Sequence, residues 1–350
     1  MLTRRASIEI KYKGKNISSD IAKDLLSFSY EDAASGESDN MDITLKDELK
    51  KWLGPWAPLE GDIITASILT TNWRKDGDKQ KLSCGSFIVD DIGYSGRPLI
   101  VNIGAIAIPV SSDFREKKKS KTWNKATMSK IAGTIAKNAK LTLVFDATDF
   151  IISFVEQSET EDISFLHDLC TKNGLSMKVY NNKLVIFSEA KYEAKPVIAT
   201  IKELDMLPGW SGKTSLTDTG YGSCLLEYTL PKNNKTYKYT FKSPKPKTTK
   251  VLKLNESVTN IAEAERITKA KLREANKKGT TLNISLPLNL NLIASCNVNI
   301  KDLGRFDGKY YIDKAKHTVG GSKTSLEMHR VLEGYRSEER RVGKECSQGV

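Results

Sequence analysis

Apolar and polar residues alternate along much of the first hundred residues of this 350-residue chain. In the segment SIEIKYK, the side chains of Ile8, Ile10 and Tyr12 share one face, and MDITLKD, residues 41–47, repeats the same period. A period of two is typical of half-buried β-strands. Three further strands are predicted in GDIITASIL, CGSFIVDDIGY and PLIVNIGAIAI, and the strand spacing favours a barrel or a sandwich over residues 1–110.

The polar segment EDAASGESDN separates two of these strands, LLSFSY and MDITL. Gly, Ser, Asp and Asn are the residues that turns prefer, and the segment is longer than the loop of a two-residue hairpin. An exposed hairpin loop is therefore predicted here.

The pattern changes after Pro109. The lysine-rich run REKKKSK is followed by TMSKIAGTIAKNA, where Met128, Ile131 and Ile135 recur at helical spacing and Thr127 is a candidate N-cap. A strand, LTLVF, follows this helix. The lysine run itself is read as a solvated loop or a protein contact, because no aromatic residues are interleaved with it.

A second helix is predicted over about 160–173, ending at Asn173-Gly174. The hairpin SMKVY-NN-KLVIF comes next, with Asn181-Asn182 as its turn. Residues 111–190 are therefore predicted to form an α+β insert between two sheet-rich regions.

Strand patterns return after residue 195 in VIATI, CLLEYTL and TYKYTFK, and again in TLNISLPLNLNL, CNVNIKD, KYYIDKAKHTV and TSLEMHRVL. Between these two groups, a long, charged and exposed helix is predicted over about 260–278. Asn260 and Glu263 have the spacing of a capping box, and Gly279 lies just beyond the helix. The fold class is thus α+β and mostly β, with a second sheet-rich region over residues 191–335.

The last fifteen residues, 336–350, have no strand or helix stripe. They fit a solvated charged tail, and they also resemble read-through from adapter or vector DNA, so we treat them as a probable non-native tail.

Composition indicates a globular chain, with 39% hydrophobic and 28% charged residues. No apolar run reaches the length of a membrane helix and no signal core follows the first residues, so neither targeting nor membrane insertion is expected. The five cysteines form no C-x-x-C pair, which argues against a zinc site and favours a reducing compartment. The net charge of +12 favours acidic partners.

Cys170 and His167 lie close together on the predicted helix 160–173. A Cys–His nucleophile pair needs a thiolate turned toward solvent, but Cys170 falls on the apolar arc of the helix and His167 at its edge. The pair is therefore read as a core cysteine beside a boundary histidine.

The acids just before this helix could supply a general acid and a base, as paired carboxylates do in glycosidases. They also suit the positive end of a helix, which Thr160 could cap, and this structural role is favoured. His317 and His329 lie on separate predicted strands without a catalytic motif. No P-loop or dinucleotide fingerprint is present either. The sequence therefore predicts no catalytic residue, no cofactor and no metal. The acids concerned are Glu156, Glu159, Glu161 and Asp162.

Several segments, in this order, resemble one family, the hub proteins of contractile phage-tail baseplates, also described as phage late control D proteins. The resemblance covers nearly all of residues 1–335 and extends to the hub region of type VI secretion spike proteins. The segments are CGSFIVDDIGYSGRPLIVNIGAIAI, FREKKKSKTW, TMSKIAGTIA, ETEDISFLHDLCTKNGLSMKVYNNKLVIF, the charged helix and GRFDGKYYIDKAKHTV.

The resemblance implies a homotrimer in which each subunit supplies two tube-like β-barrel domains, residues 1–110 and 191–335, so that three chains match a six-fold tail tube. The implied partners are the tail tube protein, a separate central spike protein and baseplate wedge proteins. The implied location is the tail baseplate of a virion or of a phage-tail-like particle, assembled in the bacterial host cytoplasm. Such a hub is structural and not an enzyme.

Two other functions remain open at this point. Tail-tip proteins sometimes carry a cell-wall hydrolase or an adhesive module, which would need a catalytic or binding surface. A nucleic-acid-binding protein would fit the net charge of +12, but no recognised nucleic-acid module accompanies it.

Overall fold

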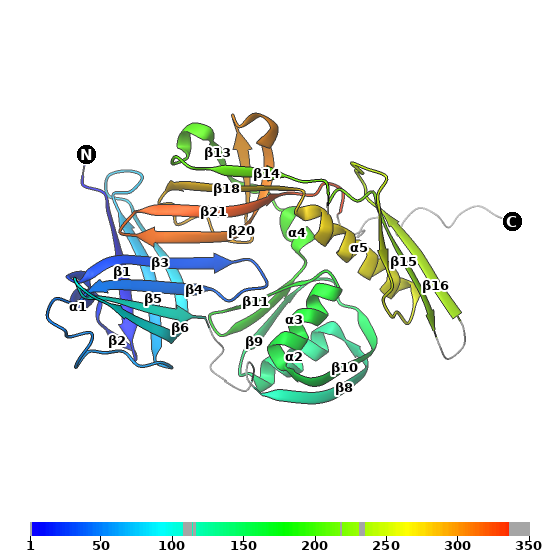
Figure 1. The fold of residues 1–350 in the computed structure, drawn as a ribbon, viewed down its shortest axis with the longest axis horizontal. Helices are drawn as coiled ribbons and strands as arrows, with labels where there is room; N and C mark the ends of the chain where they lie inside the picture. Colours follow the sequence, from blue (N-terminus) through cyan, green and yellow to red (C-terminus); the bar gives the residue numbers. More distant parts are fainter. Residues whose placement is uncertain (1, 108–113, 115–116, 218, 231–234, 336–350) are drawn as a thin grey trace.

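A computed structural model describes residues 2–107, 114, 117–217, 219–230 and 235–335. The predicted class is confirmed, because the chain is mostly β with a smaller share of helix. Within the described residues, one sheet of thirteen strands forms the largest part of the fold, and three smaller sheets lie beside it (Figure 1). The predicted tail, residues 336–350, lies outside the described residues.

The N-terminal part of the large sheet comes from the alternating segments of the first hundred residues. On β4, Met41, Ile43 and Leu45 are buried while the residues between them are more exposed, as a period of two requires. The elements are β1 (Arg5–Tyr12), β2 (Lys15–Asn16), α1 (Ser18–Ala22), β3 (Leu25–Ala33), β4 (Asn40–Lys46), β5 (Ile63–Thr71), β6 (Lys79–Ser95) and β7 (Ile100–Ile106). The predicted hairpin loop joins β3 to β4, but its Asp39 is fully buried and not exposed.

The described part of the insert contains two small sheets and the helices α2 and α3 around a separate apolar core, and the short helix α4 follows them. Thr127 caps α2 as predicted, because its Oγ1 accepts from Lys130 N at 3.2 Å. The predicted hairpin is also present, and both Asn181 and Asn182 have positive φ, as a type I′ turn requires. The elements are β8 (Lys118–Thr127), α2 (Met128–Asn138), β9 (Thr142–Asp146), β10 (Ile151–Glu161), α3 (Asp162–Lys172), β11 (Ser176–Tyr180), β12 (Lys183–Phe187) and α4 (Glu189–Glu193).

Two local predictions in the insert are wrong. The N-cap position of α3 is Glu161, and the hydroxyl of Thr160 instead donates to Ser158 O at 3.0 Å. From Lys118 onward the lysine run lies on strand β8 and not in a loop. Its antiparallel partner β10 places Glu161 opposite Lys118, so opposite charges across the strands favour the pairing.

The C-terminal part contributes six more strands to the large sheet and one separate sheet, β16-β15-β17. The predicted region 191–335 thus holds two packing units, since α5 and the separate sheet share their own small core. The elements are β13 (Val197–Lys202), η2 (Glu203–Asp205), β14 (Ser211–Thr214), β15 (Ser223–Leu230), β16 (Lys235–Lys242), β17 (Val251–Leu254), α5 (Ile261–Lys277), β18 (Thr280–Pro287), β19 (Asn297–Lys301), η3 (Gly304–Phe306), β20 (Gly308–Val319) and β21 (Lys323–Arg330).

Helix α5 differs from the exposed helix that was predicted. One face is buried, including Ile267 and Leu272, because the helix packs against β15 and β16. Asn260 caps the helix by accepting from Glu263 N at 2.9 Å. In a capping box, the Glu263 carboxylate would accept from the backbone N of Asn260. Here it accepts from the backbone N of Thr259 instead, at 2.8 Å.

The large sheet contains the same strand order twice. In the N-terminal set the pairing runs β1-β5-β6-β7-β4-β3, and in the C-terminal set it runs β13-β19-β20-β21-β18-β14. The pairs differ in direction only at the first step, since β1 is antiparallel to β5 whereas β13 is parallel to β19. Antiparallel pairing of β20 with β3 joins the two sets into one sheet (Figure 1).

A paired glycine substitution tests the contact between the insert and α5. Gly174 has a φ of +72°, and a Cβ there would lie 2.9 Å from the Cβ of Ala270 on α5. We expect Gly174→Ala to lower the free energy of unfolding by about 1–3 kcal/mol, measured by urea titration.

The control is Gly133→Ala within α2, where the nearest side-chain atom is Leu143 Cδ2 at 3.7 Å. This substitution is expected to raise stability by about 0.5–1 kcal/mol, because alanine restricts the unfolded chain and suits a helix interior. Equal effects of both substitutions would contradict the close approach at Gly174.

Candidate functional site

Cys170 and His167 do not form a nucleophile pair. Cys170 is fully buried, and burial raises the pKa of its thiol to about 12, so the thiolate is suppressed. His167 lies at the boundary, with its Nδ1 3.7 Å from Asp168 Oδ1. The predicted core cysteine and boundary histidine are confirmed.

Three of the four predicted acids lie on β10, and Asp162 is the first residue of α3. Asp162 is buried and accepts from Lys119 Nζ at 2.5 Å and from Gln157 Nε2 at 3.0 Å. Glu159 accepts from Ser120 Oγ at 2.8 Å on the surface. Of the four, only Asp162 lines the neighbouring cavity of about 320 Å³. A paired acid and base facing one substrate is therefore not assembled there.

A buried ionic joint connects the insert to the first six-strand set. Lys178 on β11 forms ion pairs with Asp32 and with Asp39, the latter at 3.0 Å. Burial raises the pKa of Asp39 to about 6, although the Lys178 ammonium acts in the opposite direction. Burial also lowers the pKa of Lys178, but both carboxylates outweigh it and leave that pKa raised. The Lys178 ammonium therefore stays charged although it and both carboxylates are largely buried.

The same carboxylates hold the backbone on both sides of the joint. Asp39 Oδ1 accepts from Ala33 N at 3.0 Å, and its Oδ2 accepts from Tyr30 Oη at 3.1 Å. Asp32 Oδ2 accepts from Ala294 N at 2.8 Å, which belongs to the C-terminal part. The first six-strand set, the insert and the C-terminal part of the chain therefore meet at this joint.

A second buried ionic joint connects α4, α5 and β21. Arg273 on α5 donates two hydrogen bonds to the Glu193 carboxylate, at 2.9 and 2.5 Å. His329 Nε2 lies 2.7 Å from Glu193 Oε1, and its Nδ1 lies 2.8 Å from both oxygens of Asp313. Because each ring nitrogen faces a carboxylate, both must donate, and the imidazole is a cation.

The pKa values in this second joint follow from its geometry. Burial lowers the pKa of His329, but Asp313 and the other acids outweigh it and raise the pKa to about 9. Burial raises the pKa of Glu193, but His329 and Arg273 outweigh it and bring the pKa to about 2. Glu189 adds a further acid, 3.6 Å from Arg273 Nη2 and 3.5 Å from Lys277 Nζ.

Within the described residues, Glu189, Glu193 and His329 bring ligand-type atoms within 4.8 Å of one another. A cation site needs a neutral imidazole and free carboxylate lone pairs. Here the imidazole is protonated and the guanidinium of Arg273 occupies the Glu193 oxygens. The arrangement is an ion-pair network.

His317 is also fully buried, but it is neutral. Burial lowers its pKa to about 4, and its Nδ1 lies 3.0 Å from Thr324 Oγ1. Its ring stacks on Tyr30, with centroids 6.4 Å apart, across the β20–β3 pair. His317 is a packing residue of that pair.

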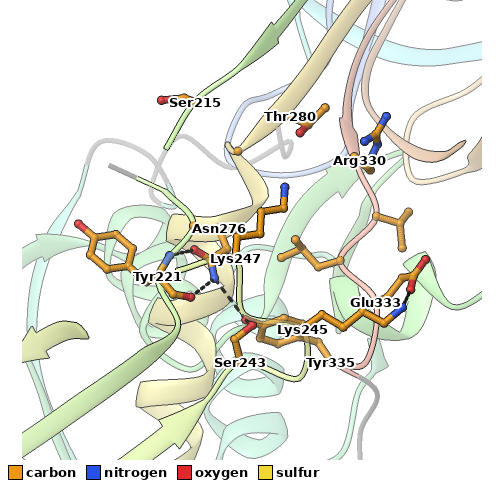
Figure 2. A pocket seen from close by; sticks show the side chains of 14 residues that line it. Ser215, Tyr221, Ser243, Lys245, Lys247, Asn276, Thr280, Arg330, Glu333 and Tyr335 are labelled. Carbon is orange, nitrogen blue, oxygen red and sulfur yellow. Dashed lines mark hydrogen bonds and ion pairs between the residues drawn. The ribbon is translucent and has the colours of Figure 1, made fainter. Parts of the chain in front are cut away.

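A cavity of about 180 Å³ lies where α5, β21 and the segment after β16 meet (Figure 2). Asn276 bridges its wall, because its amide exchanges hydrogen bonds of 2.8 and 2.9 Å with the backbone of Tyr221. Lys245 pairs with Glu333, the one carboxylate of the lining, and Lys247 and Arg330 add positive charge. Among the described residues that line it there is no histidine or cysteine, so a Ser–His or Cys–His pair is not formed there.

No protein-family model matches the chain. Over 191 residues, 52% of the chain, it is 31% identical to the probable baseplate hub protein of Escherichia phage 186. Over 177 residues it is 28% identical to the probable baseplate hub protein of Escherichia phage P2. The chain spans 46% and 42% of the length of these curated relatives.

The predicted resemblance to baseplate hub proteins is confirmed.

Solved structures share the hub-like fold. The 43 kDa tail protein of prophage MuSo2 from Shewanella oneidensis has a TM-score of 0.71 at 14% identity, with 93% of this chain and 99% of that chain covered. A type VI secretion system component of Escherichia coli has a TM-score of 0.56 at 9% identity, with 95% and 77% covered. At these identities the likeness concerns the fold.

The two ionic joints of this hub-like chain were missed by reasoning from sequence. Asp39 stands in a polar loop and Arg273 in a charged helix, where exposure is the normal expectation. Their burial depends on contacts with segments more than 70 residues away. A weak signal existed for Arg273, since it directly follows Leu272 on the apolar face of α5.

Replacing His329 tests the charge state of the second joint. The pKa of His329 is raised, so its stabilisation is complete below the unfolded value near 6.5 and is lost as pH rises through about 9. We expect His329→Gln to cost about 3 kcal/mol of unfolding free energy at pH 6 and much less at pH 9. Urea titrations at pH 6, 7.5 and 9 measure this difference.

His167→Gln is the matched control, because His167 is partly exposed on α3. Its effect should be small at each pH. A cost for His329→Gln that does not change between pH 6 and pH 9 would contradict a charged imidazole.

Proposed function

We propose that this chain is the structural hub of a phage-tail baseplate, in a virion or a phage-tail-like particle, and adapts a six-fold tail tube to a three-fold central spike. The single observation that carries the proposal is the 31% identity to a protein named as a probable baseplate hub protein. The fold shared with a prophage tail protein supports it.

The repeated strand order supports two tube-like units per chain. Two six-strand sets with the same pairing order lie in one sheet, so three chains contain six such sets. A three-fold assembly can then present a nearly six-fold surface to the tube on one side and a three-fold surface to the spike on the other. Wedge proteins would contact its outer side.

The role is one of assembly and force transmission, without catalysis. Several buried charged groups of the described residues, among them Lys178, Arg273 and His329, form ion pairs or hydrogen bonds between separate parts of the chain. Such joints hold segments in fixed positions, which suits a rigid adapter. Within the described residues, no helix combines the length and the apolar character that crossing a membrane requires.

The mass of purified residues 1–335 in solution tests the oligomeric part of the proposal. We expect three copies per particle and a central hole in low-resolution images, increasingly populated with concentration because assembly follows mass action. A monomer that persists at every concentration, with no central hole, would contradict the hub.

The competing hydrolase function has its own test. Glu159→Gln and Asp162→Asn remove the acids that a glycosidase mechanism would use. A turbidity assay on purified cell walls is expected to show no lytic activity in the intact protein and none to lose in either variant. Lysis by the intact protein that either variant abolishes would support the hydrolase instead.

A further inference from the structure

The two six-strand sets correspond residue by residue and not only strand by strand. β6 and β7 shift register between Val89 and Asp91, and β20 and β21 shift between Ile312 and Lys314. Val89 also exchanges backbone hydrogen bonds of 2.9 Å with the segment before β5, as Ile312 does with the segment before β19. Val89 is therefore the counterpart of Ile312, and Asp91 is the counterpart of Lys314.

The correspondence continues through the neighbouring strands. Val89 lies opposite Ala105, which lies opposite Met41. In the C-terminal set, Ile312 lies opposite Met328, which lies opposite Leu282. The segments MDITL and LNISL thus occupy equivalent places and share the same apolar alternation. One strand further, Tyr30 and Gly212 are counterparts.

One joint between the sets is already formed within the chain. The last residues of β20 pair with β3, from Lys314 opposite Ala33 to Val319 opposite Phe28. The counterpart of the β20 edge is the end of β6, residues 91–96. The counterpart of the β3 edge is β14 with its neighbours, residues 210–215. Among the described strands, β6 pairs with β5 only as far as Ile88, and β14 pairs with β18 alone.

We propose that the free edge at the end of β6 pairs with the β14 edge of a second copy of this chain. The intrachain joint fixes an antiparallel register, with Asp91 opposite Ser215, Gly93 opposite Lys213 and Ser95 opposite Ser211. Tyr94 then lies opposite Gly212 on the other face. This pairing rests on the proposed function, since it forms only when copies assemble.

Exposed aromatic side chains mark both free edges. Tyr94 is 41% exposed and Trp210 is 37% exposed, whereas their counterparts in the formed joint, His317 and Phe28, are both 0% exposed. The Tyr94 hydroxyl donates to Trp52 O at 3.3 Å, which holds the ring at the edge.

Gly212 leaves room for an aromatic ring of its own chain. A Cβ at residue 212 would lie 2.7 Å from the ring of Phe306, so Phe306 already covers this glycine and Tyr94 would lie beside that ring. The same Phe306 supports Trp210 edge-on, with centroids 6.1 Å apart. The β14 edge is therefore a preformed surface and not a frayed strand end.

The β20–β3 pair and the proposed β6–β14 pair each bring an acid and a base together, but on opposite strands. In the formed joint, Lys314 Nζ lies 3.9 Å from Glu31 on the diagonal position. Their counterparts are Asp91 and Lys213, both exposed, so the joint between copies has the acid and the base exchanged. Pairing β6 with β3 would bring Asp91 to Glu31, two like charges. The reversal therefore specifies which edges meet.

Charge exchange tests the proposed pairing in the full-length chain. Asp91→Lys and Lys213→Asp each place like charges at every joint between copies, and each should raise the concentration for half-assembly about tenfold, measured by sedimentation. The double variant restores opposite charges and is expected to assemble like the wild type. Lys183→Asp on β12 makes the same charge change away from the joint and should leave assembly unchanged.

A disulfide trap tests the register independently. Ser95→Cys combined with Ser211→Cys, in a Cys346→Ser background, should give covalent multimers with oxidised glutathione, because the two positions lie directly opposite. Ser95→Cys with Lys213→Cys is offset by two residues and should cross-link far less. Thermal unfolding confirms that each variant is folded.

The outcomes separate the two proposals. A wild-type trimer that both single charge variants leave intact, with no register-specific cross-link, overturns the β6–β14 pairing and leaves the hub function standing. A wild type that stays monomeric at all concentrations overturns the hub function and this pairing together.

Discussion

The antiparallel pairing of β20 with β3 is the interaction on which the rest of this structure depends. It turns two six-strand sets into one continuous sheet, so the position of one set is fixed by backbone hydrogen bonds to the other. Strand pairing is directional and register-specific, and a slip of one residue would expose the buried Phe28, Tyr30 and His317.

The buried ionic joints fix the parts of the chain that the large sheet does not include. Lys178 binds the insert to the β3–β4 loop, and Arg273 and His329 bind α4 and α5 to β21. Buried ion pairs contribute little net stability when they are compared with apolar contacts, but removing one partner is costly. Such groups therefore select one arrangement of the parts over others, and both joints lie where separate segments of the chain meet.

Much of the fold could be predicted from the sequence, because most strands bury one face and show a period of two. The hairpin of β11 and β12, the cap at Thr127 and the core position of Cys170 follow from local patterns. β14 could not be found, since all four of its residues, Ser211–Thr214, are exposed and carry no apolar alternation. β10 was missed because its polar end resembles a helix start.

The ionic joints and the internal repeat were beyond local reasoning for a different reason. The burial of Asp39 and the ionisation of His329 depend on partners from distant segments. The two sets also differ in sequence at most positions, so their equivalence becomes visible only through register and matching bulges. Sequence patterns reveal which faces are buried, whereas the structure reveals which segments bury them.

The insert between the two sets has a consequence for any larger particle. A ring of six identical subunits must carry the same decoration at every position. In a chain that holds two units and a single insert, residues 117–187 recur at every second unit only. In the proposed ring of three chains, the insert would therefore stand at three of six positions, so the ring would keep three-fold symmetry wherever the insert is exposed.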